Sequence, residues 1–407
     1  MKKSTKKTIE QFIKFGIVGV INTFTSYAVV NFCYYFLNLH LQLANIIAFI
    51  ISVFVSFTLN SKFVFKNKPK TSKEFFHTLF KTYLSYASTG LILTAILIEI
   101  ECNKLGIPLY IASLMNLVVT VPINFLLNKF WAFRKKKNLS DSDLKKLAKK
   151  HTFAICAYQE SKYLEDCIKS VLNQDIPTNY LIATSTPNKH IKSLAKKYKI
   201  SYYVRKGKSD IQDDWNFAYN HAETELVTIA HQDDLYDPNY SKYILNNYDK
   251  NILMYNTDYT PLKNGVDTSD YNSKIKRILK TFTKSKFFAR FKFFKVVSLA
   301  FGNTINCPSV TYNKKLLGDT IFTSELKFSL DWDTFLKIAK KKGICLYVPH
   351  RLVKYRIHDN ATTKKFIVNN ERQKEDVTMF NKIWPNWISK LIMKIYVKSY
   401  DTYNLDH

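Results

Sequence analysis

The sequence predicts two domains of different class: an all-α membrane domain of four transmembrane helices, then an α/β domain with a largely parallel, Rossmann-like sheet. Four long apolar stretches fill the first third of the 407 residues. The remainder alternates short apolar runs with segments of helical periodicity, the pattern of strands and helices in a parallel sheet. The length also fits two domains, because one domain usually has roughly 100–200 residues.

The composition favours a membrane as partner. Lys and Arg number 61 against 32 Asp and Glu, a formal charge of +29. The aromatic content of 15% is high for a nucleic-acid-binding tail, and no base-reading motif occurs. Anionic headgroups attract basic segments with about 1 kcal/mol per Lys or Arg near the surface. We therefore expect this charge to meet a lipid bilayer and no nucleic acid.

The cysteines and the N-terminus show no sign of secretion. The six cysteines form no Cys-x-x-Cys pair and have no His partner at zinc spacing, which predicts reduced thiols. No small-residue cleavage site precedes the first apolar run, which is too long for a signal peptide. We expect the N-terminus to be retained.

Each apolar stretch approaches the roughly 20 residues needed to cross a hydrocarbon core of about 30 Å. The stretches are 12–37, 43–61, 79–100 and 109–128. Interior Gly16, Gly19, Gly90 and Pro122 weaken soluble helices but are common in membrane helices. Four buried helices of a soluble domain are the alternative. We predict a membrane domain over 1–137.

The cations predict the orientation of these spans. The loops 38–42 and 101–108 hold only Lys104, whereas the other flanks are basic. The basic flanks contain Lys2, Lys3, Lys6 and Lys7, then Lys62, Lys66, Lys68, Lys70 and Lys73, then residues 134–137. By the positive-inside rule, both termini and the second domain are cytoplasmic in a multi-pass plasma-membrane protein.

The second and fourth spans end alike. Residues 57–60 are Phe-Thr-Leu-Asn with a Phe at 65, and residues 125–128 are Phe-Leu-Leu-Asn with a Phe at 133. Asn45 and Asn116 lie near the beginnings of the same spans. An amide at membrane depth needs a partner, so the pattern indicates two related hairpins that bond across a shared interface. Alternatively, Asn60 and Asn128 only mark the membrane surface.

Residues 10–135 resemble the GtrA-like family of small four-helix membrane proteins. The resemblance is carried by Phe15-Gly16, Gly19-x-x-Asn22, Ala44-Asn45 and the repeated Phe-x-x-Asn ending, in this order. It implies a role in cell-surface polysaccharide synthesis and in translocation of polyprenyl-phosphate-linked sugars.

The second domain is predicted to begin after a polar, charged linker at 138–150, a short cytoplasmic helix or tether. Leu164, Ile168, Val171 and Leu172 recur at helical spacing behind an expected N-cap at Ser161. Strands are predicted at 153–157, 180–184, 200–204 and 226–230. Ligands of such sheets bind beyond the carboxyl ends of the strands, so we expect the chemistry just after Ala157, Thr184 and Ala230.

An acidic turn, His231-Gln232-Asp233-Asp234, follows the last of these strands. Asp233 and Asp234 offer the hard oxygen ligands that suit Mg²⁺ or Mn²⁺ on a diphosphate. The alternative is a helix N-cap or an Asx-turn, because Asp237-Pro238 marks a turn in any case.

Residues 151–365 resemble the family 2 glycosyltransferases of GT-A fold. Five motifs carry the resemblance: Ala157-Tyr158-Gln159-Glu160, Ser170 to Gln174, His231 to Asp234, Asp331-Trp332-Asp333 and Tyr355 to His358. It implies that Ala157, Tyr158 and Glu160 cradle the nucleotide of a nucleotide-sugar donor. It also implies that 231–233 is the metal- and ribose-binding element, and that Asp331 is the base of an inverting hexosyl transfer.

Two positions depart from the family pattern. Thr184-Ser185-Thr186 replaces the strand-end Asp that contacts the base, which leaves the base open. His231 replaces the first Asp of Asp-x-Asp and brings no negative charge, so Asp233 is the expected principal ligand. Asp214 and Asn216 lie where relatives carry nucleotide-facing residues, whereas we assign Trp215 to the core.

Sugar transfer needs two further groups. The departing diphosphate must be neutralised, for which Arg356 and His358 are candidates beside the metal. The alternative for His358 is a surface turn before Asp359-Asn360. A carboxylate must deprotonate the acceptor hydroxyl, and we favour Asp331 over Asp333.

A basic stretch at 273–299 holds nine Lys or Arg and no acid. Ile275, Ile278, Leu279 and Phe282 share one helical face, with Arg277, Lys280 and Lys284 at its flanks. This is typical of an interfacial helix, and a solvated basic helix over the core is the alternative. The amphipathic extension 366–407, with Trp387, Ile388, Leu391 and Ile392, adds a second expected contact.

The resemblances together imply a membrane-anchored transferase whose acceptor is a polyprenyl phosphate or a lipid-linked glycan. The membrane domain would translocate the product. The chain lacks the spans that usually follow the catalytic domain of polyprenyl-phosphate sugar synthases, which keeps the glycan acceptor open. The alternative function is a translocase or binding protein with an inactive transferase-like domain. Self-association also stays open.

Overall fold

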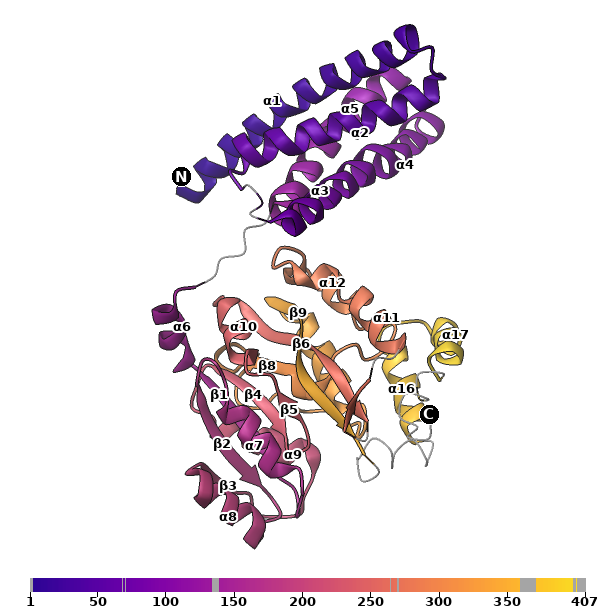
Figure 1. The fold of residues 1–407 in the computed structure, drawn as a ribbon. Coiled ribbons are helices and arrows are strands. Elements are labelled where there is room, and N and C mark those ends of the chain that lie inside the picture. Colours follow the sequence, from indigo (N-terminus) through magenta and orange to yellow (C-terminus); the bar gives the residue numbers. More distant parts are fainter. Residues whose placement is uncertain are drawn as a thin grey trace. The chain divides into compact units, whose positions relative to one another are not determined.

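A computed structural model describes residues 3–67, 69, 71–133, 139–263, 265–268, 271–358, 371–397 and 400. The chain divides into two compact units, 1–136 and 137–407, and each is described by itself (Figure 1). The basic residues Lys2, Lys68, Lys70 and 134–137 lie outside the described residues, as do Asp359-Asn360 and 366–370.

The first unit consists of four helical segments long and apolar enough to cross a membrane: Thr8–Phe36, Leu41–Val64, Glu74–Lys104 and Leu109–Ala132. This confirms the four predicted spans. The helices are α1 (Lys3–Asn31), α2 (Leu41–Leu59), α3 (Ser72–Ala87), α4 (Thr94–Ile98) and α5 (Leu109–Leu127). Wider π-helical turns continue them at η1 (Phe32–Phe36), η2 (Asn60–Val64), η3 (Ser88–Leu93), η4 (Glu99–Lys104) and η5 (Asn128–Ala132).

The bundle exposes large apolar side chains and buries small, polar and aromatic ones. Large side chains such as Tyr27 and Val118 point outward, and Val118 is 76% exposed. Ala44, Ala48 and Ala112 are fully buried, together with Ser56, Asn60 and Asn128. Small residues allow close helix approach where lipid removes the hydrophobic drive between helices. The distribution fits a lipid-facing surface.

The predicted repeat is visible in the structure. Asn60 and Asn128 each begin a π-helical turn, and the amides of Phe65 and Phe133 close those turns by donating to the carbonyls of the two Asn. The two phenylalanine rings stack at 4.9 Å.

The two amides do not bond to each other, however, but to adjacent residues of α3. Asn60 Nδ2 lies 3.5 Å from the hydroxyl of Tyr86, and Asn128 Nδ2 donates to Ser85 Oγ at 3.1 Å. Asn45 and Asn116 differ, because Asn45 is exposed and Asn116 is buried. The bond of Asn60 therefore crosses from the first hairpin to the second, whereas that of Asn128 lies within the second hairpin.

The second unit contains a mixed sheet, in which the described strands follow the order β3-β2-β1-β4-β8-β6-β9-β5, with β7 on β6. The strands are β1 (His151–Cys156), β2 (Asn179–Thr184), β3 (Ser201–Val204), β4 (Leu226–His231), β5 (Leu235–Tyr236), β6 (Ile252–Lys263), β7 (Val266–Asp267), β8 (Val310–Asn313) and β9 (Ile344–Ile357). The four predicted strands are β1 to β4, and they are parallel. β8 runs antiparallel between β4 and β6, which the sequence pattern did not indicate.

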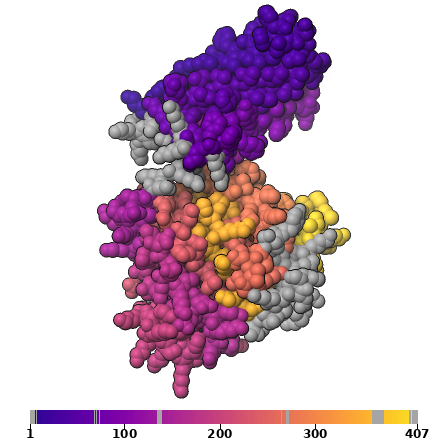
Figure 2. Space-filling view, in the orientation of Figure 1, coloured from indigo at the N-terminus to yellow at the C-terminus, as the bar shows by residue number. Residues whose placement is uncertain are grey.

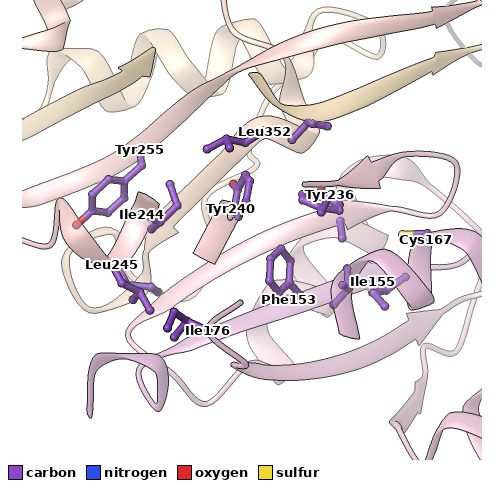
Figure 3. Close-up of a cluster of buried hydrophobic side chains, with 14 of the residues drawn as sticks. Phe153, Ile155, Cys167, Ile176, Tyr236, Tyr240, Ile244, Leu245, Tyr255 and Leu352 are labelled. Carbon is purple, nitrogen blue, oxygen red and sulfur yellow. The ribbon is translucent and has the colours of Figure 1, made fainter. Parts of the chain in front are cut away.

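Helices cover both faces of this sheet. They are α6 (Asp141–Ala148), α7 (Leu164–Leu172), α8 (Lys189–Tyr198), α9 (Ile211–His221), α10 (Tyr240–Asn246), α11 (Tyr271–Leu279), α12 (Lys292–Val297), α13 (Lys314–Leu317), α14 (Leu330–Lys340), α16 (Glu371–Asn381) and α17 (Asn386–Tyr396). Successive residues of a strand point to opposite faces. Accordingly Phe153 and Ile155 join one core with α7 and α10, and Ala154 joins the other with α9 and α14. Figure 3 shows Phe153 beside Tyr236 and Tyr240 in the first core.

The expected N-cap at Ser161 is wrong, whereas the linker predicted as a short helix or tether does contain a helix. Helix α7 begins at Leu164 after Tyr163 and has no side-chain cap, because Ser161 Oγ instead accepts the Tyr163 amide in the preceding turn. The predicted linker contains α6, which is capped by Ser140 and buries Leu144 and Ala148. It is packed as part of the second unit.

The basic stretch is not one helix, so that expectation was wrong. α11 ends at Leu279, and short 3₁₀ turns at Phe282–Lys284 and Phe288–Arg290 lead to α12. The break follows from two buried lysines. Lys280 Nζ lies 4.1 Å from the centre of the Tyr347 ring, and Lys295 Nζ donates to the carbonyls of Lys341 and Gly343.

Candidate active site

A cavity of about 1610 Å³ opens at the carboxyl ends of β1 and β4. It lies where the strand pattern predicts the chemistry, next to Ala157 and His231. Of the predicted site residues, Ala157, Tyr158, Glu160, Asp214, His231, Asp233, Asp331, Arg356 and His358 line it. Ser185, Asn216, Asp234 and Asp333 do not.

The turn after β1 is tied to the turn after β4. The backbone of Tyr158 exchanges two hydrogen bonds of 2.9 Å with the side-chain amide of Gln232, one to each of its heteroatoms. Gln159 has a left-handed backbone, φ 52°, and donates its amide to Thr186 Oγ1 after β2. Three strand ends are thereby fixed to one another, which leaves Tyr158 and Glu160 exposed at the cavity.

Ser185, at the end of β2, binds a carboxylate that comes from helix α9. Its Oγ donates to Asp214 Oδ2 at 2.7 Å, and Arg205 Nε donates to Asp214 Oδ1 at 2.7 Å. Asp214 lines the cavity. Ser185 lies where the family pattern has an Asp at the end of the second strand. Asp214 of α9 therefore brings a carboxylate next to this position.

Trp215 and Asn216, which follow Asp214 in α9, have different surroundings. Asn216 binds the backbone of Phe322 through both its amide nitrogen and its oxygen. Trp215 packs at 5.1 Å against the Phe322 ring, in line with the core assignment, yet its indole also lines the cavity and stacks on His231 at 5.0 Å.

Asp233 and Asp234 point in different directions. Asp233 Oδ2 lies 3.0 Å from His358 Nε2, and its carboxylate faces the cavity. The Asp234 side chain is 1% exposed, and its Oδ1 accepts the Arg356 amide at 2.9 Å. Asp234 therefore anchors β9, and of the two carboxylates Asp233 alone is accessible to a ligand.

The two carboxylates also differ in acidity. Burial, and then the charge of Asp233, raise the pKa of Asp234 well above its ordinary value, which favours the neutral acid. For Asp233, burial is outweighed by the hydrogen bond to His358 and by the nearby imidazoles, so its pKa is lowered. Burial lowers the pKa of His231, which therefore favours the neutral imidazole. Of these three side chains, Asp233 therefore carries the negative charge that a ligand can reach.

These residues fit a divalent metal only with help from the substrate. The described part of the chain holds no group of three or more His, Cys, Asp or Glu that could bind a metal ion. Mg²⁺ commonly takes one or two carboxylates, with substrate phosphates and water completing its shell. Asp233 supplies such a carboxylate, with the His358 ring next to its Oδ2.

Arg356 is held in a well-defined position. Its guanidinium lies 4.2 Å from the centre of the Tyr163 ring, and its Nε donates to the Asp233 carbonyl at 2.9 Å. The His358 ring lies 5.2 Å from the same tyrosine ring. Tyr163 thus supports both predicted cations. No feature of the sequence indicated this role, because Tyr163, just before α7, makes these contacts with residues at the end of β9.

The two candidate bases are clearly separated. Asp331 lines the cavity and accepts hydrogen bonds from Asn303 Nδ2 at 3.0 Å and from the Trp332 amide. Burial raises its pKa to about 6. Asp333 is buried elsewhere and binds Lys337 at 2.8 Å and Lys382 at 2.6 Å. Their positions favour Asp331.

Known proteins were compared with this chain. Residues 14–133 match the family described as "GtrA/DPMS, transmembrane domain", and residues 152–310 match "Glycosyl transferase family 2". With the four spans and the mixed α/β sheet, these matches define a membrane-anchored transferase of two domains. The chain joins a GtrA-like transmembrane domain to a family 2 glycosyltransferase domain.

Curated relatives match the first domain along nearly their whole length. The chain is 27% identical over 129 residues to "Prophage bactoprenol-linked glucose translocase homolog" of Escherichia coli, 32% of this chain and 99% of the relative. It is 29% identical over 137 residues to "Cell wall teichoic acid glycosylation protein GtcA" of Listeria monocytogenes, 32% of this chain and 88% of the relative.

Solved structures resemble the second domain at low identity. The mannosyltransferase PcManGT of Pyrobaculum calidifontis, in complex with GDP-Man and Mn²⁺, has a TM-score of 0.44 at 14% identity and covers 61% of this chain and 69% of its own. S. aureus TarS 1-349 with UDP-GlcNAc has a TM-score of 0.42 at 15% identity. The match covers 63% of this chain and 73% of the TarS chain.

Proposed function

We propose that the second unit transfers a sugar from a nucleotide diphosphate-sugar to a lipid-linked acceptor, a polyprenyl phosphate or a lipid-linked glycan, at the cytoplasmic face. One observation carries the proposal. A single cavity is lined by one set of residues, Asp233, Arg356 and His358, and by a further carboxylate, that of Asp331. The first set suits a diphosphate leaving group and the second suits the attacking group.

The donor binds along the strand ends in this proposal. The exposed turn at Tyr158–Glu160 and the carboxylate of Asp214 form the walls around the nucleoside. Arg356, fixed by Tyr163 and by the Asp233 carbonyl, neutralises the departing diphosphate. A pre-positioned cation stabilises developing negative charge without reorganisation during the reaction. A divalent metal held by Asp233 and His358 would add Lewis-acid stabilisation of the same leaving group.

The transfer is proposed to invert the anomeric centre in one displacement. Asp331 takes the proton of an acceptor hydroxyl as its oxygen attacks, and the bond to the diphosphate breaks. A carboxylate with a pKa of about 6 is mostly ionised at neutral pH while remaining a better proton acceptor than an exposed aspartate.

The experiment uses the full-length protein in lipid nanodiscs with Mn²⁺ and a panel of nucleotide sugars. Release of nucleoside diphosphate is measured for the wild type, for Asp233→Ala and for the control Asp175→Ala, a partly exposed carboxylate outside the cavity. We expect Asp233→Ala to lose at least about a hundredfold, the range of other single electrostatic contacts to a leaving group. Equal background rates for all three proteins would refute the enzymatic proposal.

The cytoplasmic placement rests on the distribution of cations. A single cysteine introduced at Lys68 should resist a membrane-impermeant maleimide added to intact cells, whereas one at Asn38, in the opposite loop, should react. The reverse pattern would overturn the orientation.

A second function, translocation of a lipid-linked sugar by the first unit, is favoured by one observation. Relatives named bactoprenol-linked glucose translocases match this unit over 99% of their length. The Asp233→Ala protein in proteoliposomes should move bactoprenol-linked glucose between leaflets, measured by its accessibility to an impermeant oxidant. Protein-free liposomes give the background, and a rate equal to it would exclude this function.

The second unit is also proposed to contact the bilayer. The 271–301 segment and α17 expose Ile278, Phe293, Trp387 and Ile395 among lysines, with Phe293 68% exposed. Both segments come to the surface in Figure 2, 271–301 in orange and α17 in yellow. They pack together, because Trp384 Nε1 donates to the Ala300 carbonyl. Apolar side chains flanked by cations are typical of surfaces that insert among anionic lipids.

A photo-reactive phenylalanine analogue tests this contact. Placed at Phe293 in the full-length protein in nanodiscs that contain phosphatidylglycerol, it should cross-link to lipid. The same analogue at Val204, exposed on β3, should not. If the analogue at Phe293 cross-linked only to a second copy of the protein, this surface would contact protein and not the bilayer.

A further inference from the structure

The cavity continues beyond Asp331, on the side away from the strand ends. There it is bounded by the segment 324–329, by α14 and by residues of α16 and α17, including Arg372, Asp376 and Tyr396. All of these follow residue 310, where the family 2 match ends. This acceptor-side wall therefore belongs to the part of the chain that the match does not describe.

Helix α16 fixes this wall through one carboxylate. Glu375 accepts three backbone amides, from Lys327 at 2.9 Å and from Phe328 and Ser329 at 2.8 Å each. These amides immediately precede α14, whose second residue is Asp331. The wall and the proposed base are thus held by the same contact.

A second carboxylate of α16 faces the same space. Asp376 is 2% exposed, accepts the hydroxyls of Ser329 at 2.9 Å and Tyr400 at 2.7 Å, and lines the cavity. Its negative charge contributes to the raised pKa of Asp331, after burial itself. The other titratable groups that interact with Asp331 are Lys276, Cys307 and Tyr312. Two carboxyl groups therefore stand on the acceptor side.

The arginine of this wall is already engaged. The Arg372 guanidinium lies between the rings of Phe328 and Tyr400, at 4.8 Å and 4.3 Å, and its Nε is 3.5 Å from Asp376. Lys276 Nζ lies 3.3 Å from the Tyr259 hydroxyl. Glu325 and Lys327 of the 324–329 segment also line the cavity, so three basic and three acidic side chains stand on this side and leave no excess of positive charge.

Phosphate and hydroxyl acceptors make opposite demands on such a wall. A phosphate monoester is already ionised at neutral pH, with a second pKa of about 6, so its oxygen needs no base. It would also find no excess of positive charge on this side and would approach the ionised Asp331 against like charge. A hydroxyl keeps its proton at neutral pH and needs a nearby base to lose it during attack.

We infer that the acceptor is the hydroxyl group of a glycan or polyol, not the phosphate oxygen of a polyprenyl phosphate. The inference rests on the proposed function and narrows its acceptor. The acceptor O–H proton passes to Asp331 while the oxygen forms a bond to the anomeric carbon. The bond from that carbon to the diphosphate oxygen breaks, and the nucleoside diphosphate leaves with the electron pair.

The test offers two acceptors to the full-length protein in nanodiscs, with the donor that the panel identifies. One is a polyprenyl phosphate and the other a polyprenyl-diphosphate-linked disaccharide. We expect sugar transfer to the disaccharide and a loss of about 10²–10⁴-fold in Asp331→Asn, with an unchanged KM for the donor. The wild-type rate should fall tenfold per pH unit below about pH 6, where Asp331 becomes protonated.

Asp319→Asn is the matched control, the same change at an exposed carboxylate outside the cavity, and should leave the rate unchanged. Thermal unfolding of both variants verifies that they fold. Transfer to the polyprenyl phosphate that persists within about threefold in Asp331→Asn would overturn the inference. Absence of donor turnover with either acceptor, in the wild type, would instead refute the proposed function.

Discussion

The two walls of the cavity are built differently. The donor wall consists of turns that follow β1, β2 and β4, and its contacts link segments with recognisable motifs, such as 157–160 and 231–234. The acceptor wall consists of 324–332 and α16, joined by carboxylates that bind backbone from distant parts of the chain. The contrast indicates that, in the proposed function, the donor wall is formed by short recognisable motifs, whereas the acceptor wall depends on tertiary contacts of the C-terminal helices.

The largest effect is expected on the donor wall. Arg356→Ala removes the cation proposed to stabilise the leaving diphosphate and should lower kcat by about 10²–10³-fold. Arg351→Ala, an exposed arginine of the same strand, is the control. A steady-state assay with saturating acceptor measures the effect, and an unchanged kcat would remove Arg356 from the leaving-group site.

An intermediate effect is expected on the acceptor wall. Glu375→Ala frees three backbone amides beside Asp331, and small displacements of a catalytic group can cost about a hundredfold. We expect transfer to fall by about 10–100-fold while the KM for the donor stays constant. Glu375→Gln, which retains one acceptor oxygen, should recover part of the rate. A changed donor KM would show that the two walls are not independent.

The smallest effect is expected from the clasp between the β1 and β4 turns. Gln232→Ala removes two neutral hydrogen bonds, each contributing about 0.5–1.5 kcal/mol. The KM for the donor should rise by about tenfold with little change in the transfer step. Gln373→Ala on the exposed face of α16 is the control for the same substitution. A defect confined to kcat would place Gln232 with the catalytic groups instead.

The membrane unit was predicted well because lipid imposes a strong and simple constraint on sequence. Apolar length alone located the four spans. The repeated Asn60 and Asn128 also predicted a bonded interface, but not that adjacent residues of α3 supply both partners. Partner choice depends on helix rotation and packing, which periodicity does not specify.

In the catalytic unit, strand-end motifs located Asp233, Arg356 and Asp331 at one cavity. The same motifs ranked Asp233 before Asp234 and Asp331 before Asp333 but kept all four as candidates, whereas Asp234 and Asp333 are buried and bonded elsewhere. Residue type shows what a side chain can do, and burial decides whether a ligand can reach it. Tyr163 and Glu375 were missed, and Gln232 was placed in the metal-binding element without its bonds to Tyr158, because these contacts join segments far apart in the chain.

The buried Lys280 couples proton binding to the folding of the second unit. Burial lowers its pKa from 10.5 in the unfolded chain to about 7 in the folded unit. Below about pH 7 the folded unit bears the full cost of enclosing an ammonium ion. Between about pH 7 and 10.5 the unfolded chain binds one proton more than the folded unit, so the free energy of unfolding rises with pH. Mild acid should therefore weaken the packing of Lys280 on Tyr347, and with it the position of the exposed Phe293, the side chain proposed to contact lipid.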